Sequence, residues 1–437
     1  MFKRTVAAVI ALAVALCLTV CRVDAAPEAV RHMKDDNWLV YIYICGTDLE
    51  EGGLASQSLE EMRNVSLPPN VNVLIYANGA INWQHELIEK KGPGIYRLYS
   101  GGLSKLSSWK ADMGKPDTLK KFLKFGEKIF NPDHRIIVFW DHGGVNGLCY
   151  DSAFDLTSKP EFQHNLTFYD LNKVFKSVYG HSDKKPFELV GFNTCMSASY
   201  ELANSISDYS RYMVGSEPSE NGWFFYTWLA ALAENPAMNG AAIGQLICDG
   251  NMNRYRQRYE NIREKYGVET ADLYNVEQVN AFSVIDLSKM PKLRKAYENY
   301  FAEANKRSVK ERGFSGAFAR AASGGQAERY SNSYTDLSIL AENTSNILPE
   351  ASAELIAAID EAVFYNRPGS YLRGKGISTY YPYALGNFNN FLTQKATPSS
   401  QKSLYKNLLK LDVSNLSGLP IKENSLRKTF LGAVSRQ

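Results

Sequence analysis

A histidine and a cysteine each stand where a buried strand is expected to end. His142 lies in Trp-Asp-His-Gly-Gly at the end of the apolar run 135–141, and Cys195 lies in Asn-Thr-Cys-Met after the run 187–192. In an open parallel sheet, ligands bind outside the carboxyl ends of the strands, so neighbouring strands would bring both side chains to one crevice. An imidazole there can assist deprotonation of a thiol, which makes Cys195 a candidate nucleophile and His142 its candidate base.

The backbone around these two residues adds to the prediction. We expect a helix at 195–205, whose N-terminus would favour the thiolate of Cys195. The glycines after His142 leave an amide uncovered, so the N–H groups of Gly143 and Cys195 are predicted to form an oxyanion hole. Each motif alone also fits an ordinary structural role, a small buried cysteine or a simple turn. Their conjunction is what favours catalysis.

Strands and helices alternate between residues 38 and 216. We predict strands at 38–46, 71–78, 95–100, 135–141, 187–192 and 211–216, and helices at 52–64, 117–129, 166–179 and 195–205. This alternation indicates an α/β fold in which helices cover both faces of a parallel sheet. Residues 228–364 are mostly helical in pattern, with an apolar run at 280–286, and a late strand is expected at 375–382.

The first 25 residues have the features of a signal peptide. Two basic residues precede an uncharged run at 5–20, and Ala25 fits a small-residue cleavage site. A retained anchor is the alternative, because the run nearly reaches the roughly 17 residues needed to span a bilayer. A lipid on Cys21 is disfavoured because bulky Val20 precedes it. We expect an exported protein (periplasmic, secreted or surface-associated) with no integral membrane span after signal removal.

Composition and cysteine usage exclude several classes. With 437 residues, 45% hydrophobic and 22% charged, the chain is neither disordered nor a polytopic membrane protein. Without residues 1–25 it carries 46 basic and 45 acidic residues, which gives no case for a nucleic-acid partner. No cysteine pair has CxxC spacing, and four cysteines remain after the signal, Cys45, Cys149, Cys195 and Cys248. A thiol that stays free in an exported protein is a candidate for chemistry.

Five segments together resemble the clostripain family of cysteine peptidases (peptidase family C11), which belongs to the same clan as the caspases. They run in order from about residue 38 to 411 and read WLVYIYICGTDLE, VFWDHGG, FNTCMSASYELA, GSEPSENGW and GISTYYP. The resemblance implies a caspase-like α/β/α sandwich with a mostly parallel central sheet and a mainly helical C-terminal portion. It also implies hydrolysis of protein or peptide substrates through a thioester on Cys195, with His142 as base and then acid. It assigns no catalytic role to Asp141.

The residues expected around the substrate differ from the family pattern. Members that cut after Arg or Lys typically carry Asp two residues before the nucleophile and an acidic residue after the Trp of Gly-Trp-Asp-Tyr. Here those positions hold Asn193 and Phe224. A buried cation without a negative partner is costly, so we predict a primary pocket for neutral or apolar side chains, lined by Asn193, Trp223 and Phe224. Glu217, or else Glu220, is the acidic residue that could turn into this pocket and restore a charge.

We divide the chain into a signal peptide at 1–25, a linker at 26–37, a catalytic core at 38–229, a helical portion at 230–411 and a tail at 412–437. The helical portion is expected to return the strand 375–382 to the core. Many relatives mature by self-cleavage in a loop that corresponds to 150–165, where Lys159 is followed by Pro160 and makes a poor scissile bond. We expect a monomer, and self-processing into two associated chains stays open.

No metal or cofactor is required by these motifs. Calcium activation is known in the family, but the chain has no DxDxDG-type loop, and Asp48, Glu50 and Glu51 are as readily a solvated face. Calcium therefore enters only through the resemblance.

Two other functions stay open. The chain could be a non-catalytic relative that serves as a binding or inhibitory module, although intact His142 and Cys195 speak against this. It could also be a Cys–His amidase or transpeptidase acting on cell-wall peptides, which a neutral pocket would suit.

Overall fold

The computed structural model describes residues 37–145, 147–153, 165–181, 184–324, 328–330, 334–381 and 397–409. The predicted signal peptide, the linker up to residue 36, most of the predicted self-cleavage loop (154–164) and the tail at 412–437 lie outside the described residues. In the described ranges, no helix has both the length and the apolar character needed to cross a membrane.

Five parallel strands form the middle of a nine-stranded sheet. In spatial order they are β2 (Val71–Asn78), β1 (Trp38–Cys45), β5 (His134–Trp140), β8 (Phe187–Asn193) and β9 (Ser210–Ser216). All were predicted from continuous apolar runs, which is the pattern of strands buried on both faces. Their carboxyl ends therefore meet at one edge of the sheet.

Antiparallel strands flank this parallel centre on both sides. Beyond β2 lie β3 (Gly94–Tyr99) and β4 (Gly102–Ser107), and beyond β9 lie β10 (Ala281–Asp286) and β13 (Val363–Pro368). The sequence predicted β3 and the apolar run of β10 but missed the two outermost strands. Edge strands are exposed on one or both faces, so β4 and β13 lack the continuous apolar run that marks a central strand.

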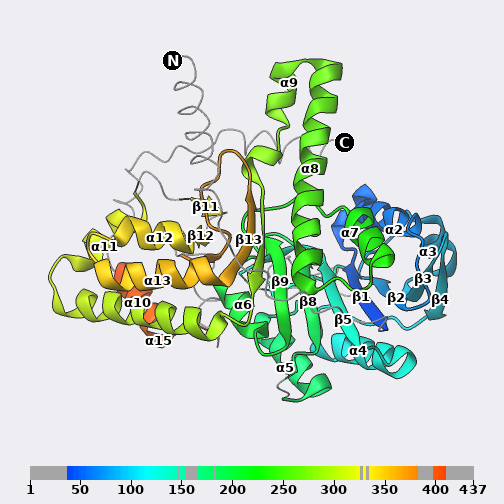
Figure 1. Cartoon of the computed structure of the whole chain (residues 1–437), viewed down its shortest axis with the longest axis horizontal. Helices are drawn as coiled ribbons and strands as arrows, with labels where there is room; N and C mark the ends of the chain where they lie inside the picture. The colour runs from blue at the N-terminus through cyan, green and yellow to red at the C-terminus, as the bar shows by residue number, and fades with distance from the viewer. Residues whose placement is uncertain are drawn as a thin grey trace, which may run out of the picture. The chain divides into compact units, whose positions relative to one another are not determined.

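Helices cover both faces of the sheet, as the sandwich prediction requires (Figure 1). Alternate residues of β1 point to opposite cores, Leu39 and Tyr41 to one and Val40 and Ile42 to the other. The helices α4 (Pro116–Phe130), α5 (Phe168–Tyr179) and α6 (Tyr200–Ile206) pack on the first face, and α2 (Leu54–Arg63), α7 (Phe225–Glu234) and α8 (Gly240–Tyr266) pack on the second. The caspase-like α/β/α expectation is thus confirmed.

A mainly helical portion follows the last parallel strand. Besides α7 and α8 it contains α9 (Val268–Leu273), α10 (Met290–Lys310), α11 (Phe314–Ala322), α12 (Leu337–Thr344), α13 (Pro349–Ala362) and α15 (Ser399–Leu409). It also carries a small sheet of β11 (Arg329–Tyr330), β12 (Tyr334–Asp336) and β14 (Ser378–Tyr380).

The late strand expected at 375–382 is shorter in the structure. As β14 it pairs with β12 in the small sheet and takes no place in the central one. It still touches the core, because the Ser378 N–H donates to the Ala198 carbonyl at 2.8 Å. The strands of this half of the chain that do join the central sheet are β10 and β13.

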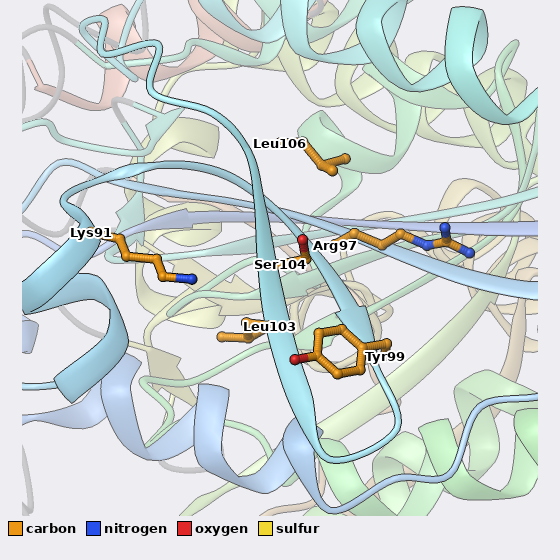
Figure 2. A pocket seen from close by; sticks show the side chains of 6 residues that line it. All are labelled: Lys91, Arg97, Tyr99, Leu103, Ser104 and Leu106. Atoms are coloured by element: carbon orange, nitrogen blue, oxygen red, sulfur yellow. The ribbon is translucent and has the colours of Figure 1, made fainter.

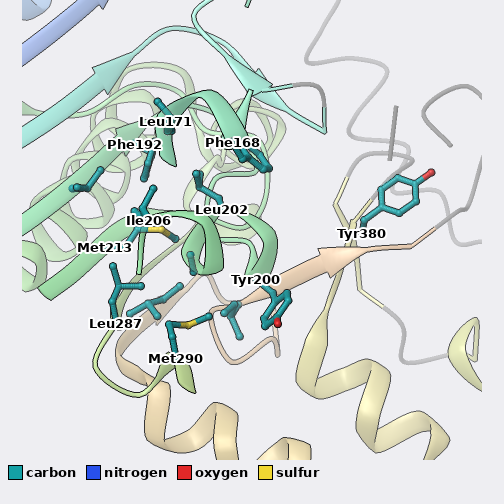
Figure 3. Close-up of a cluster of buried hydrophobic side chains, with 14 of the residues drawn as sticks. Phe168, Leu171, Phe192, Tyr200, Leu202, Ile206, Met213, Leu287, Met290 and Tyr380 are labelled. Carbon is teal, nitrogen blue, oxygen red and sulfur yellow. The ribbon is translucent and has the colours of Figure 1, made fainter. Parts of the chain in front are cut away.

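One core cluster links the helical portion to the strands that precede Cys195. Figure 3 shows Phe192, Leu202, Ile206 and Met213 gathered between β8, β9 and α6. In the same cluster Tyr200, the first residue of α6, stacks on the ring of Tyr297 of α10, with ring centroids 3.6 Å apart. The segment that carries Cys195 is therefore anchored by buried contacts on both sides.

Candidate active site

The carboxyl ends of β5 and β8 place His142 and Cys195 just beyond two neighbouring strand ends. Trp140 and Asn193 are register partners at the ends of these parallel strands. The Asp141 N–H donates to the Asn193 carbonyl at 3.3 Å, so the pairing continues past the strand end. His142 and Cys195 each follow this pair by two residues, as the sequence predicted.

Gly143 packs closely against the backbone of Cys195 and the side chain of Thr194. A Cβ atom at this position would lie 2.6 Å from the Cys195 carbonyl oxygen and 2.7 Å from the Thr194 hydroxyl oxygen. Real Cβ contacts are longer, so only glycine permits this approach. The glycine after the histidine thus lets the two loops meet.

The amide of Gly143 points away from its own hairpin. Gly143 and Gly144 form β6, which pairs with β7 (Gly147–Leu148). Leu148, the partner of Gly143, exchanges both of its main-chain hydrogen bonds with Leu166, at 2.9 and 2.8 Å. A residue uses one side of a strand for both groups, so Gly143 and Leu148 form a non-hydrogen-bonded pair. The Gly143 N–H is then directed away from Leu148 and takes no part in the hairpin's own hydrogen bonds.

The expected helix at 195–205 begins later than predicted. It starts at Tyr200, with Ser199 as its N-cap, and Met196 takes a left-handed φ of 53°. The Met196 N–H donates to the Pro218 carbonyl and the Ala198 N–H to the Ser216 carbonyl, which hold the chain out of the helix. The prediction that a helix N-terminus stabilises the Cys195 thiolate is therefore wrong.

Burial, followed by the charge of Glu220, raises the pKa of the Cys195 thiol to about 11. Its sulfur lies 3.9 Å from the main-chain carbonyl oxygen of Glu220. All four cysteines that the structure describes are free. Cys195 is partly exposed, whereas the other three are buried. In this arrangement the thiol carries its proton and needs a base to become a nucleophile.

His142 contacts a carboxylate that the sequence did not single out. Its Nε2 atom lies 2.9 Å from the Oδ1 atom of Asp48, the first residue of the short 3₁₀ helix η1 (Asp48–Gly52) that follows β1. Burial opposes the charged ring, but the hydrogen bond that the ring donates to Asp48 and the charge of Asp141 outweigh it, so the pKa of His142 is raised. The same hydrogen bond lowers the pKa of Asp48. Asp48 follows a buried strand just as His142 does, and that position was the signal that could have found it.

The Asp141 side chain joins the end of β5 to two other segments through hydrogen bonds. It is buried, and its carboxylate accepts hydrogen bonds from the Thr47 hydroxyl (2.9 Å) and the Tyr150 N–H (2.5 Å). Burial raises its pKa to about 7. These bonds tie the loop after β1 to the end of β5 and to the segment after β7.

Two of the predicted pocket residues lie on one face of β8. Asn193 is 3% exposed, and its Nδ2 atom is buried without a hydrogen-bond partner. Trp223 packs on the same strand, since a Cβ at Gly191 would lie 2.9 Å from its ring. The indole N–H of Trp223 donates to Glu220 at 2.8 Å.

Phe224 is held beside a cation. Its N–H donates to Asn251 at 2.7 Å, and the Arg254 guanidinium lies 4.5 Å from its ring centroid. Arg254 also pairs with Glu61 at 2.7 Å.

Glu217 is placed elsewhere. It is 1% exposed, and its carboxyl group interacts with Asp336 and Glu328, at the small sheet. The structure therefore places Trp223 and Glu220 together, with Trp223 on the face of β8 that carries Asn193, whereas Glu217 interacts with Asp336 and Glu328.

Other polar features lie apart from this site. In the described ranges, no group of three or more His, Cys, Asp or Glu side chains is arranged to hold a metal ion. Glu50, expected on a solvated face, is buried and accepts hydrogen bonds from the Ser56 and Gln84 N–H groups. A pocket on the outer hairpin of the sheet (Figure 2) is lined by Lys91, Arg97, Tyr99, Leu103, Ser104 and Leu106, none of which belongs to the candidate site.

Solved structures show the same fold. A structure described as an inactive zymogen C11 protease from Parabacteroides distasonis is similar with a TM-score of 0.57 at 15% identity, over 86% of this chain and 99% of that one. A secreted C11 cysteine protease from Bacteroides thetaiotaomicron, in complex with an irreversible peptide inhibitor, is similar with a TM-score of 0.56 at 16% identity, over 85% of this chain and 99% of that one. No curated protein matches the sequence.

The sequence profile of the clostripain family matches residues 42–410. This range covers the sheet, the strand ends that carry His142 and Cys195, and the helical portion up to its last described helix. The chain therefore belongs to the clostripain family of cysteine peptidases.

Proposed function

We propose that this cysteine peptidase is an exported endopeptidase in which Cys195 is the nucleophile and His142 the general base. The observation that carries the proposal is the junction of two strand ends, where Trp140 pairs with Asn193 and Gly143 packs against Cys195. Two residues that are 53 positions apart in sequence thereby reach one edge of the sheet.

The reaction follows from these groups. His142 takes the proton from the Cys195 thiol as sulfur attacks the carbonyl carbon of the scissile peptide bond. The N–H groups of Gly143 and Cys195 donate to the oxyanion that forms. His142 then returns the proton to the leaving amine, and a thioester remains on Cys195. Water, deprotonated by His142, releases the acid product and regenerates the thiol.

The pH dependence follows from the two pKa directions. Only the neutral imidazole can accept a proton, so the raised pKa of His142 moves the acidic limit of activity above the ordinary value near 6.5. The thiol, with its pKa raised to about 11, stays protonated at neutral pH and depends on that base.

For substrate preference, we propose a neutral or apolar residue before the scissile bond. Where the family pattern has an acidic residue, Phe224 lies against Arg254, whose charge is paired with Glu61. The buried Asn193 amide adds a neutral donor. A cationic substrate side chain would find no unpaired carboxylate at these two positions, which disfavours it. Glu220 is the acidic residue on this side, and burial raises its pKa well above the usual range, which keeps it neutral.

Export is proposed from the signal-peptide features of residues 1–25, with lipid attachment at Cys21 disfavoured. We propose a monomer. Self-processing within 150–165 and calcium dependence are left to experiment.

The test is a cleavage-site profile by mass spectrometry on a peptide mixture that is diverse at the residue before the scissile bond. Cys195→Ala is the key variant, and Cys248→Ala is its matched control, because Cys248 is a free, buried cysteine on α8. We expect cleavage after neutral or apolar residues that Cys195→Ala abolishes and Cys248→Ala retains. Dominant cleavage after Arg would overturn the pocket proposal.

Absence of cleavage, with and without calcium, combined with no labelling of Cys195 by a peptide acyloxymethyl ketone, would favour a binding module over an enzyme. Labelling of Cys195 without endopeptidase activity would favour an amidase or transpeptidase.

A further inference from the structure

We propose that Asp48 is the positioning residue that orients the His142 imidazole for its reaction with Cys195. The inference deepens the proposed function and rests on it. Its basis is the 2.9 Å contact between Asp48 Oδ1 and His142 Nε2, which joins residues 94 positions apart. Asp48 contacts the proposed base, so the role that this contact supports is to hold the ring.

The loop that leads into η1 is built to aim Asp48. Thr47, the residue before it, has φ 46° and ψ −148°, a region that a β-branched residue rarely adopts. Such a conformation costs about 1–3 kcal/mol and persists only where the surroundings enforce it. Here the Thr47 hydroxyl donates to the buried Asp141 carboxylate at 2.9 Å. Asp141 directly precedes His142, so one strained loop fixes both partners of the contact.

The contact also decides which ring nitrogen is free. In the neutral imidazole, Nε2–H donates to Asp48, and the lone pair is then on Nδ1. Nδ1 accepts the proton of the Cys195 thiol, which leaves an imidazolium whose Nε2–H still donates to Asp48. Nδ1 gives that proton to the leaving amine, and the ring returns to its starting tautomer. Asp48 remains ionised throughout and takes no proton.

Two charged groups act on the ring, Asp48 from the start of η1 and Asp141 from the end of β5. Asp141 is fixed by Thr47 and Tyr150, whereas Asp48 makes its side-chain contact with the ring itself. The His142 and Asp48 side chains are 43% and 69% exposed, so water screens their attraction. The expected contribution of Asp48 is therefore orientation and tautomer choice more than charge.

The experiment compares three full-length variants with the wild type. Asp48→Asn keeps the shape and removes the charge, Asp48→Glu keeps the charge on a longer side chain, and Glu51→Gln removes a neighbouring exposed carboxylate as the matched control. Two readouts are taken: the pKa of His142 from an NMR titration of its imidazole, assigned with His142→Ala, and the pH profile of kcat and KM.

For Asp48→Asn we expect kcat to fall about tenfold to a hundredfold, a part of the 10²–10⁴ that a positioned base supplies. KM should stay unchanged, the His142 pKa should fall, and the acidic limit of activity should move to lower pH. Asp48→Glu should recover part of kcat, and Glu51→Gln should resemble the wild type in every readout.

Two results would overturn the proposal: an unchanged His142 pKa in Asp48→Asn, or a lowered pKa with unchanged kcat. The first would mean that the contact does not exist in solution, and the second that it is an ion pair without a role in the reaction. The NMR readout is independent of peptide cleavage. Failure of the proposed function would instead appear in the wild type, as cleavage that is absent or insensitive to Cys195→Ala.

Discussion

Asp48 and Glu217 both follow parallel strands of the central sheet, yet their surroundings act on them in opposite directions. Asp48, after β1, is 69% exposed and faces an imidazole, which lowers its pKa. Glu217, directly after β9, is 1% exposed and faces Asp336 and Glu328, and burial raises its pKa well above the usual range. The exposed carboxylate of Asp48 can hold a charge beside His142, whereas the buried carboxyl group of Glu217 keeps its proton.

The buried region favours a protonated Glu217. Asp336 accepts hydrogen bonds from Ser338, Ile339 and Lys375, and Glu328 accepts from Tyr330 and Gly374. Burial and the interaction with Asp336 raise the pKa of Glu217 and outweigh the hydrogen bond from the Gly376 backbone, which lowers it. An uncharged Glu217 is thus the state that this region accommodates.

The largest expected effect is that of Asp336→Ala on stability. The side chain caps α12 through the Ile339 N–H and also accepts from Ser338 and Lys375. Its loss should lower the free energy of unfolding by about 3–5 kcal/mol, because buried donors are left unpaired. Urea denaturation measures this, with Glu342→Ala, an exposed position on the same helix, as the control. A loss below about 1 kcal/mol would contradict the structural role of this region.

The next effect is the pH dependence introduced by Glu217. The folded state retains a proton that the unfolded state loses above the ordinary pKa, so this contribution to stability is lost as pH rises. Glu217→Gln cannot titrate at this position. As pH rises from the ordinary Glu pKa towards the raised pKa of the folded state, its free energy of unfolding should therefore increase relative to that of the wild type by about 1.4 kcal/mol per pH unit. Urea denaturation at pH 5 to 9 tests it, and parallel curves for the two proteins would refute it.

Glu220 lies beside the Cys195 thiol and sharpens the comparison. At a pH at which Glu220 is ionised, its charge raises the pKa of Cys195, whereas a hydrogen bond from the Ser219 side chain lowers that pKa. Glu220→Gln should therefore speed alkylation of Cys195 by iodoacetamide at alkaline pH, by up to about tenfold for each unit of pKa, and Ser219→Ala should slow it. Equal alkylation rates for the two variants would show that neither group acts on the thiol.

The smallest expected effect is that of Asp48→Asn on stability. Because the pKa of Asp48 is lowered in the folded state, its contribution is present above the ordinary pKa and is lost as pH falls through the folded value. An exposed pair contributes about 0.2–1 kcal/mol, so the free energy of unfolding should change by less than 1 kcal/mol at neutral pH. A larger loss, measured by urea denaturation, would place Asp48 with the structural carboxylates.

The sequence predicted secondary structure best where the hydrophobic pattern of a segment depends on that segment alone. The apolar runs of β1, β2, β5, β8 and β9 identified the parallel strands, because a strand buried on both faces leaves a continuous signal. The same signal placed His142 and Cys195 at strand ends. The predicted helix from 195 to 205 failed because hydrogen bonds from Met196 and Ala198 to the segment 216–218 compete with helix formation, and no local pattern records them.

The pocket shows the same division. Asn193 and Gly191 share one face of β8, which the two-residue repeat of a strand implies, but that Trp223 packs on this face at Gly191 is a tertiary contact. Glu217 could not be assigned from its position, since its direction depends on a small sheet built from residues more than a hundred positions later.

By itself, the sequence determined the helices and strands of the core, their order, and the position of His142 and Cys195 after two strands. It could do so because hydrophobic runs and periodicity are local properties of the chain. Tertiary structure decided which neighbours those residues meet. The placement of β1 beside β5 brings Asp48 to His142, and Asp336 of the small sheet lies beside the buried Glu217 that follows β9. Such contacts depend on strand order and on competition among distant hydrogen bonds, which no window of sequence contains.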